Sequence, residues 1–564
     1  MRHTLINPTL LGLSLILTVT CHAAERADLA ILNANVLTMD ASRPLAEAVV
    51  LRGGRIVYVG DTKGAQAWAA DKLVDAAGAT VMPGLIDTHI HPVIGAVQMD
   101  DCSLDDRRLT LEQIAEVVSG CMGGTADLPQ GQILSVINLN PANFTASKSD
   151  LDKITALPLA LFATDEHTAW ANSAALALAG IGKNTAAPAN GQLVRNSAGE
   201  PTGQLIDNAT QLLKPYLPRD DFQTSVEMTA RALQLMHAAG LTSLMEASAT
   251  EEELKIYREL ADTGRLTMHT SVALRTETSN SEENLRQLLA LRERYSGASN
   301  LRIDTAKIFV DGVLESPTQS AALLQPYLDA KGKPTAHTGN LYAGGRELNG
   351  LVMALARENF NVHLHAIGDR AVRAGLDAFA TARKQQSAAR FSISHLELIH
   401  PDDLPRFAAL DVYASFQLAW GQPDHYSVEA VQPYLGDVRS RWIYPAKSLL
   451  DAGASIAGGS DWNVSSFNPF EAMAVAICRC NFEEPERGLL LPEQALGTQD
   501  MLRAYTINAA AMLGLEGETG SLTPGKRADL ILLDRDVSRA DAASLRDTKV
   551  LATLAAGRLV HGRM

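Results

Sequence analysis

The chain has 564 residues, of which 46% are hydrophobic and 20% charged, and its formal net charge is −15. This composition is that of a large globular protein with ample apolar material for a core. The negative charge disfavours nucleic acid and anionic membrane surfaces as partners, so we expect a small-molecule substrate and no nucleic acid.

Residues 1–24 have the pattern of a secretory signal peptide. Arg2 supplies a positive start, residues 10–20 (LLGLSLILTVT) are apolar but too short to span a bilayer comfortably, and small residues precede Glu25. We expect cleavage near Glu25, export to the periplasm or the medium, and no stable membrane anchor. An uncleaved anchor is the alternative, whereas a lipoprotein that uses Cys21 is disfavoured by a poor lipobox.

Short strand-like runs separated by turn residues mark both ends of the mature chain. Residues 25–80 contain several such runs, with Gly53 and Gly54 as a hairpin signal. Residues 519–564 show the same pattern of short strands and turns. Each end is too small to bury a core alone, so we predict one small composite β-sandwich built from both termini. Two independent β modules are the alternative.

The middle of the chain alternates apolar runs with helical patterns, which is typical of a parallel α/β fold. Candidate strands end near the following residues: Asp87, Glu246, Leu274, Val310, Ile367, Leu396, Gln417 and Asp461. Most spacings fit one or two units of about 31 residues, so we predict a (β/α)₈ TIM barrel from residues 81–94 and 221–518. The spacing that does not fit is the one after strand 1, where the segment is much longer than a single unit. We therefore place residues 95–220 in an inserted subdomain that emerges at the barrel's C-terminal face.

Candidate metal ligands fall at the ends of these predicted barrel strands. In MPGLIDTHIHP, His89 and His91 are two residues apart on a strand, so both imidazoles point the same way and form half of a divalent metal site. Three further candidates end strands 5, 6 and 8: His365, His395 and Asp461.

Lys307 and Asp461 have separate expected roles. Lys307 lies on an apolar barrel strand, where a free ammonium is costly, and carboxylation by CO₂ turns it into an anionic bridging ligand for two metals. Asp461 can bind metal through one oxygen and accept a proton from water through the other. His363 shares a face with His365 but lies deeper in the barrel, and we expect it to be structural.

Residues near the barrel mouth are candidates for contact with substrate. His167 and Trp170 lie in the insertion, in a segment that we predict to be helical, and Gln417 and Trp420 follow strand 7. We predict substrate contacts for His167, Trp170 and Gln417. Inward packing of Trp170 is the alternative.

Four of the five cysteines remain once Cys21 leaves with the signal peptide, and none has a zinc-finger spacing. Cys102 and Cys121 can form a disulfide in an oxidising compartment, which contributes roughly 3 kcal/mol in the loop-entropy model. Reduced thiols are the alternative. Cys478 and Cys480 are poorer candidates, because one intervening residue rarely allows unstrained geometry.

The ligand pattern resembles that of the amidohydrolase superfamily. The following residues match, in order, the ligands on strands 1, 4, 5, 6 and 8 of its binuclear members: His89, His91, Lys307, His365, His395 and Asp461. MPGLIDTHIH and TINAAAMLGLEGETGSLTPGKRADLILLD resemble its entry and exit signatures, so the resemblance covers nearly all of the mature chain. DEHTAWANSAAL, GLTSLMEAS, KIFVDG and VHLHAIGDRAV are similar to the branch that includes N-substituted formamide deformylases. That branch commonly has Asp where Glu246 stands.

The resemblance implies a metal-dependent hydrolase that cleaves a C–N bond of an amide, formamide or cyclic amide, with Asp461 as the proton shuttle. It implies one or two divalent ions, with zinc the default and manganese or iron nearly as suitable. Deamination or ester hydrolysis is an alternative, since the same ligands serve these reactions. An exported, non-catalytic metal-bearing binding protein is disfavoured because it needs no Asp461. The sequence leaves the oligomeric state open, and a homo-oligomer is compatible with it.

Overall fold

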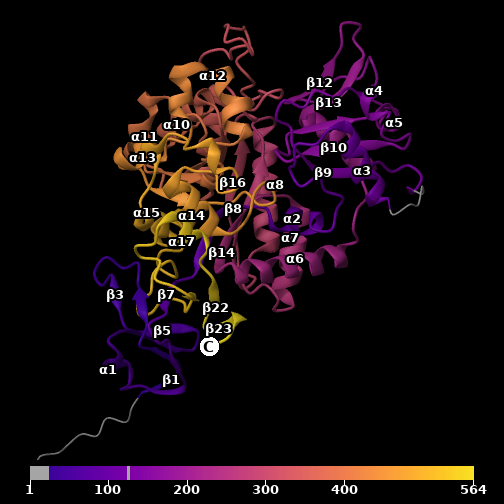
Figure 1. Cartoon of the computed structure of the whole chain (residues 1–564). Helices are drawn as coiled ribbons and strands as arrows, with labels where there is room; N and C mark the ends of the chain where they lie inside the picture. The colour runs from indigo at the N-terminus through magenta and orange to yellow at the C-terminus, as the bar shows by residue number, and fades with distance from the viewer. Residues whose placement is uncertain (1–24, 123–127) are drawn as a thin grey trace, which may run out of the picture.

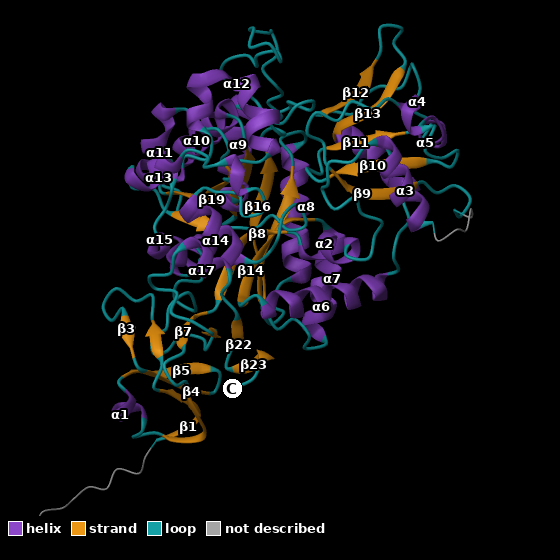
Figure 2. Ribbon diagram, viewed as in Figure 1, coloured by secondary structure: helices purple, strands orange, loops and turns teal. Residues whose placement is uncertain are grey.

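The computed structural model describes residues 25–122 and 128–564 and divides into three parts (Figures 1 and 2). A barrel occupies the centre, an inserted β subdomain lies beside it, and a small β-sandwich joins the indigo and yellow ends of the chain. The predicted signal peptide lies outside the described residues. Within the described ranges, no helix is long and apolar enough to cross a membrane.

Eight parallel strands form the barrel in chain order: β8 (Leu85–Ile90), β14 (Leu241–Ala249), β15 (His269–Thr276), β16 (Leu301–Phe309), β17 (Asn361–Ala366), β18 (Phe391–His395), β19 (Val412–Phe416) and β20 (Ile456–Gly458). The last strand returns to the first, since Thr88 Oγ1 donates to Gly458 O over 2.9 Å and Asp461 N donates to His89 O over 2.7 Å. The predicted TIM barrel is confirmed.

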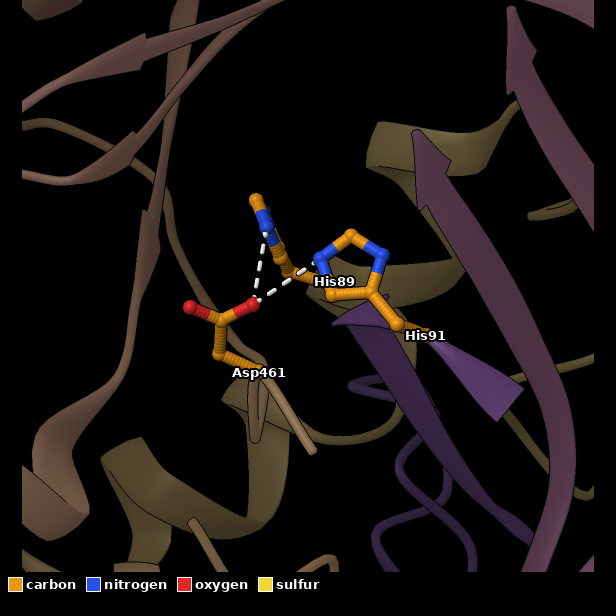
Figure 3. A group of neighbouring side chains, drawn as sticks. All are labelled: His89, His91 and Asp461. Atoms are coloured by element: carbon orange, nitrogen blue, oxygen red, sulfur yellow. Dashed lines mark ion pairs between the residues drawn. The ribbon is translucent and has the colours of Figure 1, made fainter. Parts of the chain in front are cut away.

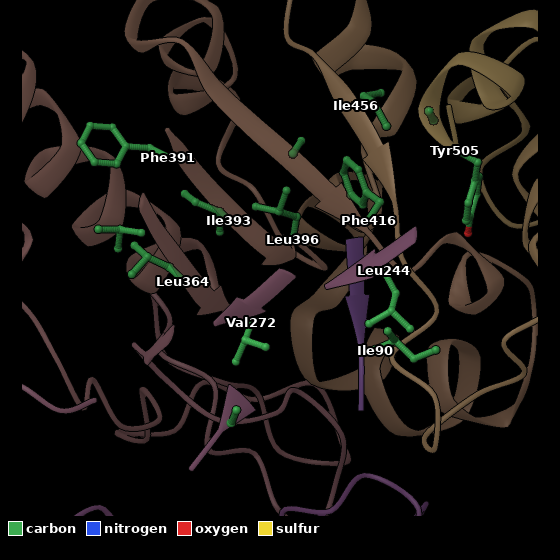
Figure 4. Packing of buried hydrophobic residues seen from close by; sticks show 14 of the residues in the cluster. Ile90, Leu244, Val272, Leu364, Phe391, Ile393, Leu396, Phe416, Ile456 and Tyr505 are labelled. Atoms are coloured by element: carbon green, nitrogen blue, oxygen red, sulfur yellow. The ribbon is translucent and has the colours of Figure 1, made fainter. Parts of the chain in front are cut away.

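Alternation along the strands separates the barrel's apolar exterior from its polar interior. On β17, Val362 and Leu364 belong to the hydrophobic core, and Leu364 approaches Gly375 of α10 (Asp369–Lys384). The intervening His363 and His365 therefore face inward. Figure 4 shows the same apolar layer around the barrel, with labelled side chains that include Ile90, Leu244, Val272, Ile393 and Phe416.

Helices pack around the barrel: α6 (Phe222–Ala238), α7 (Glu251–Asp262), α8 (Ser281–Tyr295), α9 (Gly345–Arg357), α10, α11 (Leu404–Leu410), α12 (Gln432–Arg439), α13 (Ala446–Asp451), α14 (Pro469–Cys478), α15 (Thr498–Ala504), α16 (Ile507–Leu513) and α17 (Ala542–Arg546). The helix before strand 2, α6, shows how sequence sets such boundaries. Asp221 caps its first turn by accepting from Thr224 N over 2.9 Å. Gly240, at φ +87°, turns the chain into β14.

The insertion leaves the barrel through α2 (Pro92–Gln98) and forms its own sheet, in the order β12-β13-β11-β10-β9. Its strands are β9 (Leu134–Leu139), β10 (Leu159–Ala163), β11 (Thr168–Ala171), β12 (Gly191–Arg195) and β13 (Pro201–Asp207), and its helices are α3 (Leu111–Cys121), α4 (Lys148–Leu151) and α5 (Ser173–Leu178). Two separate hydrophobic clusters lie within it. The subdomain thus has a core of its own.

One prediction within the insertion is wrong: the segment around Trp170 is a strand where we predicted a helix. Residues 168–171 pair with both β10 and β13, so their backbone groups bond across the sheet. The helix begins only at Ser173, because Asn172 Oδ1 accepts from Ala175 N over 2.9 Å and caps it.

Both pairs of described cysteines form disulfides. Cys102–Cys121 ties the end of α3 to the start of the insertion, as the sequence allowed. Cys478–Cys480 corrects our expectation that these two residues are poor partners. Between them, Arg479 adopts a left-handed conformation (φ 57°) where α14 ends, and this turn brings the two Cα atoms to 5.1 Å.

The β-sandwich combines the two ends of the chain. One sheet holds β1 (Arg26–Leu32), β4 (Ala48–Arg52), β5 (Arg55–Gly60) and β6 (Ala69–Asp75). The other holds β2 (Asn35–Leu37), β3 (Leu45–Ala46), β7 (Thr80–Pro83), β21 (Leu530–Leu533), β22 (Val550–Ala555) and β23 (Arg558–Gly562). Side chains from both termini share one core, for example Ile31 and Leu530.

The junction between sandwich and barrel lies slightly later than the predicted start of strand 1 at residue 81. β7 pairs with β21 of the sandwich, and β8 begins at Leu85. Gly84 separates them where the chain passes Thr242, since a Cβ there would lie 2.2 Å from Thr242 Oγ1. A residue with a side chain does not fit this crossing.

Candidate metal centre and its cavity

A cavity of about 850 Å³ opens where the barrel strands end. Its walls come from the loops that follow the strands and from the insertion, which contributes the turn between β10 and β11. This volume is in the range of small-molecule sites. The C-terminal ends of the strands are also where barrel enzymes place their chemistry.

Three side chains converge at the cavity (Figure 3): His89 on β8, His91 directly after it, and Asp461 after β20. The Nε2 atoms of His89 and His91 lie 3.3 and 3.1 Å from Asp461 Oδ1. One ligand atom from each residue lies within 4.8 Å of the others. Side chains alternate along β8, so His89 and His91 point the same way. β20 lies next to β8 where the barrel closes, and this brings Asp461 to the two histidines.

The other predicted ligands line the same cavity. Lys307 Nζ, on β16, lies 3.4 Å from His89 Nε2. His395 Nδ1 lies 3.7 Å from Asp461 Oδ2 and is buried without a hydrogen-bond partner. The ring of His365 lies 4.4 Å, between centroids, from that of His395. The structure thus brings all six predicted ligands to one place.

His363 lies deeper in the barrel than the three converging side chains and contacts His89. Its Nε2 lies 2.8 Å from His89 Nδ1, and its own Nδ1 lies 2.7 Å from Ser392 Oγ. With Nδ1 engaged in this way, His89 directs Nε2 toward Asp461. His363 is fully buried and does not line the cavity, in accord with a structural role.

Glu246 on β14 has a role that the sequence analysis missed. Its Oε1 lies 3.2 Å from His91 Nδ1, and its Oε2 accepts from Tyr257 OH over 2.9 Å. A fully buried glutamate on an apolar strand is costly unless it is partnered, and that was the available signal. Glu246 orients His91 much as His363 orients His89.

The electrostatics of the centre favour a bound cation. Burial lowers the pKa of His89 to about 3 and those of His365 and His395 well below the usual value, so these imidazoles keep free lone pairs. Burial raises the pKa of Asp461, but the surrounding histidines outweigh it and keep the carboxyl ionised. Burial also opposes charge on His91, yet Asp461 and Glu246 raise its pKa to about 10. Positive charge is therefore preferred between these two carboxylates.

His167 brings the insertion into the site. Its Nδ1 lies 2.7 Å from Asp207 Oδ1, and its ring lies 5.4 Å, between centroids, from that of His365. Asp207 also accepts from Ser320 Oγ over 3.3 Å and from the Tyr342 hydroxyl. His167 lines the cavity in a fixed orientation.

Two of the predicted substrate contacts are wrong in position. Trp170 is 1% exposed and packs edge-on against Phe144 in the core of the insertion, away from the cavity lining. Gln417 is fully buried, and its Oε1 accepts from His395 N over 2.9 Å, so it supports a ligand strand. Trp420 does line the cavity and stacks on the His395 ring, with centroids 5.7 Å apart and planes 4° apart.

A TIM barrel with these side chains at its mouth defines the class of protein as a hydrolase of the amidohydrolase superfamily. The amidohydrolase family matches residues 72–561, and the chain belongs to that family. It is 31% identical to N-substituted formamide deformylase from Arthrobacter pascens, over 96% of this chain and 99% of that protein. It is 30% identical to Protein LONG AFTER FAR-RED 3 from Arabidopsis thaliana, over 96% and 93% of the two chains.

Among solved structures, an uncharacterized metal-dependent hydrolase from Pyrococcus horikoshii OT3 has the same fold. The TM-score is 0.70, with 23% identity over 91% of this chain and 99% of that one. The likeness therefore includes the barrel together with most of the rest of the chain.

Proposed function

We propose that this hydrolase cleaves a C–N bond of a small amide, formamide or cyclic amide and depends on a divalent metal. The observation that carries the proposal is the convergence of His89, His91 and Asp461 at the cavity, with Lys307, His365 and His395 beside them. The similarity to a formamide deformylase along nearly the whole chain supports formamides within this class.

The residues present fit a divalent ion. They offer imidazole nitrogens and carboxylate oxygens, and the buried His395 Nδ1 has no hydrogen-bond partner among the described residues. This mixed donor set suits zinc best, and manganese or iron nearly as well. When bound, such a cation supplies Lewis-acid chemistry: it polarises a carbonyl and lowers the pKa of water.

Asp461 is the proton carrier in this proposal. Its carboxylate is ionised, with Oδ1 toward His89 and His91 and Oδ2 toward His395. It takes a proton from the attacking water and returns it to the departing nitrogen, which leaves as a neutral amine. His167, held through Nδ1 by Asp207, contacts the substrate with its other ring nitrogen.

Lys307 serves as a carboxylated bridging ligand in the two-metal form of the proposal. Burial lowers the pKa of Lys307 to about 7, so a neutral amine is available at neutral pH. The Nζ lone pair attacks the carbon of CO₂, and the nitrogen loses a proton to give a carbamate. Incubation with ¹³C-bicarbonate should give a carbamate NMR signal that is missing in Lys307→Ala. If Lys307→Ala keeps two metal ions and the full rate, a single-metal site is the better description.

The main test is a turnover screen of metal-defined protein. Chelated protein should be inactive and should regain activity with zinc, manganese or iron on amides, formamides or cyclic amides. Esters and amino-heterocycles test the ester-hydrolysis and deamination alternatives on the same centre. Full activity in exhaustively chelated protein contradicts metal dependence. Metal-loaded protein that turns over nothing favours a binding protein.

We further propose that the mature protein is exported and begins near Glu25, on the strength of the N-terminal pattern. Mass spectrometry of a periplasmic fraction should find an N-terminus within a few residues of Glu25. An intact Met1 on exported protein contradicts this.

A further inference from the structure

One wall of the cavity is strongly acidic. Glu315 follows β16, Glu397 follows β18, and Asp424 precedes η5 (His425–Val431) after β19. Asp165 reaches the same wall from the β10–β11 turn of the insertion. All four line the cavity, and Glu315 lies in electrostatic range of Asp165, Asp424 and Glu397. We call these four residues the acidic wall.

The basic side chain that acts on the acidic wall is His167, whose charge opposes the rise in pKa of Asp165 and Glu315. Within the described ranges, none of its four carboxylates forms a salt bridge, although ion pairs are frequent elsewhere on the chain. Glu315 Oε2 is buried and has no hydrogen-bond partner, and Glu397 is 3% exposed. Burial raises the pKa of Glu315 to about 7 and that of Asp424 to about 6, which reflects the cost of unpaired buried charge.

These carboxylates are arranged differently from the metal centre. In the described part of the chain, His89, His91 and Asp461 form the group of three whose ligand atoms come within 4.8 Å of one another. The four acidic-wall carboxylates form no such compact group of three. An ammonium or guanidinium group is larger than a metal ion and donates several hydrogen bonds in different directions.

Aromatic rings accompany the acidic wall. Tyr444 lines the cavity beside Glu397, with the Arg479 guanidinium 5.9 Å from its ring centroid, and Trp420 stacks on His395, so its ring adjoins the metal centre. Aromatic faces attract organic cations, and carboxylates with aromatic rings are a typical combination for binding them. The cavity therefore has a reactive side and a cation-attracting side.

We propose that the acidic wall binds a cationic group of the substrate, so that the protein acts on amides that carry an ammonium or guanidinium group. This inference rests on the proposed amide hydrolysis and names the substrate class within it. Glu315 and Asp424 are the main specificity-determining residues, since they lie outside the metal centre and flank Glu397.

The first experiment compares formamides that share a five-carbon chain and differ at its end. N-formyl-1,5-diaminopentane ends in an ammonium group, N-formylhexylamine in a methyl group, and N-formyl-6-aminohexanoate in a carboxylate. We expect kcat/KM to be at least roughly tenfold higher for the ammonium than for the methyl compound, and lowest for the carboxylate. Equal or better turnover of the methyl compound overturns the inference.

The variants Glu315→Gln and Asp424→Asn should each lower the ammonium-to-methyl ratio about tenfold, because each removes a carboxyl group that a bound cation would keep ionised. Glu429→Gln is the matched control: Glu429 lies on η5 near Asp424 but outside the cavity lining, paired with Arg108 at 2.9 Å and Arg487 at 3.3 Å. It should keep the ratio of the wild type. An equal drop in the control contradicts a role for the acidic wall.

Calorimetry with pentylguanidinium measures cation binding without turnover; this probe donates hydrogen bonds but stays protonated, so it has no nitrogen lone pair with which to ligate a metal. Wild-type protein should bind it, and Glu315→Gln should bind it about tenfold more weakly. If no formamide is hydrolysed but this binding is seen, the proposed function fails while the cation site stands. If formamides are hydrolysed without preference and the probe does not bind, the cation site fails alone. Thermal unfolding of each variant checks that it is folded.

Discussion

The barrel and the insertion build two sides of one cavity by different means. The barrel supplies side chains at strand ends, and buried neighbours fix two of them: His363 contacts His89, and Glu246 contacts His91. The insertion has its own hydrophobic clusters and reaches the cavity through the turn that carries Asp165 and His167. In the proposed function, the groups that hold the metal lie on rigid strands, and the groups that select the substrate lie mainly on loops.

This difference predicts different consequences of mutation. Changes at the strand ends should remove metal or abolish the chemical step. Changes in the insertion should leave the metal in place and alter the use of substrate.

Replacing Asp461 should have the largest effect. Asp461→Asn keeps the shape of the side chain but loses the proton acceptor, so kcat should fall about 10³-fold while metal is largely retained. Steady-state kinetics and elemental analysis of the same sample measure both. Asp411→Asn, a change of the same type at an exposed position, should be neutral. Retention of a large share of activity in metal-loaded Asp461→Asn contradicts the shuttle.

Removing the support beneath His89 should weaken metal binding. His363→Ala frees His89 Nδ1 from its 2.8 Å contact, so metal affinity should fall about 10- to 100-fold. Competition with a chromophoric chelator measures this without turnover. His400→Ala, on the partly exposed segment after β18, is the control and should bind metal as the wild type does. Unchanged affinity in His363→Ala removes His363 from the centre.

In the insertion, His167→Gln should lower kcat/KM roughly tenfold through loss of a substrate contact, with metal content unchanged. Asp207→Asn should act in the same direction, because it releases His167 Nδ1. Kinetics and elemental analysis distinguish the two sides of the cavity. Loss of metal from His167→Gln means that the insertion belongs to the metal centre after all.

The smallest effect on activity should come from the disulfide of the insertion. Replacing Cys102 and Cys121 with serine should leave metal content and kcat near those of the wild type. The loop-entropy model gives a loss of about 3 kcal/mol in the free energy of unfolding of the part that the bridge closes. Limited proteolysis should then cut the insertion faster than the barrel. Equal protection with and without the bridge contradicts this.

The barrel and the strand-end positions of the proposed ligands were predictable because they depend on local periodicity. His89, His365 and Asp461 each follow an apolar run, and a barrel brings all strand ends to one face. The positions of Trp170 and Gln417 depend on which face of a strand meets a distant partner. Trp170 packs against Phe144, and Gln417 accepts a hydrogen bond from the backbone of His395. Neither contact can be inferred from the local sequence pattern.

The acidic wall and Glu246 were missed for a related reason. Glu315, Glu397 and Asp424 stand far apart in sequence on different loops, where acidic residues are ordinary. Only the closed barrel places them together on one wall of the cavity. In the sequence, Glu246 stood out only as a departure from the Asp that is common in the similar branch, and the fold adds its contacts with His91 and Tyr257.

The pairing of β7 with β21 also has a consequence for the order of folding. Met82 lies opposite Ile531, so the base of the first barrel strand is fixed by a segment synthesised near the very end of the chain. Contacts between such distant residues form late, because the intervening loop must first be closed. Until then β7 has an unpaired edge, and the His-x-His strand that follows Gly84 lacks its anchor. The sandwich end of the strand that carries His89 is therefore completed only after the C-terminus has been made.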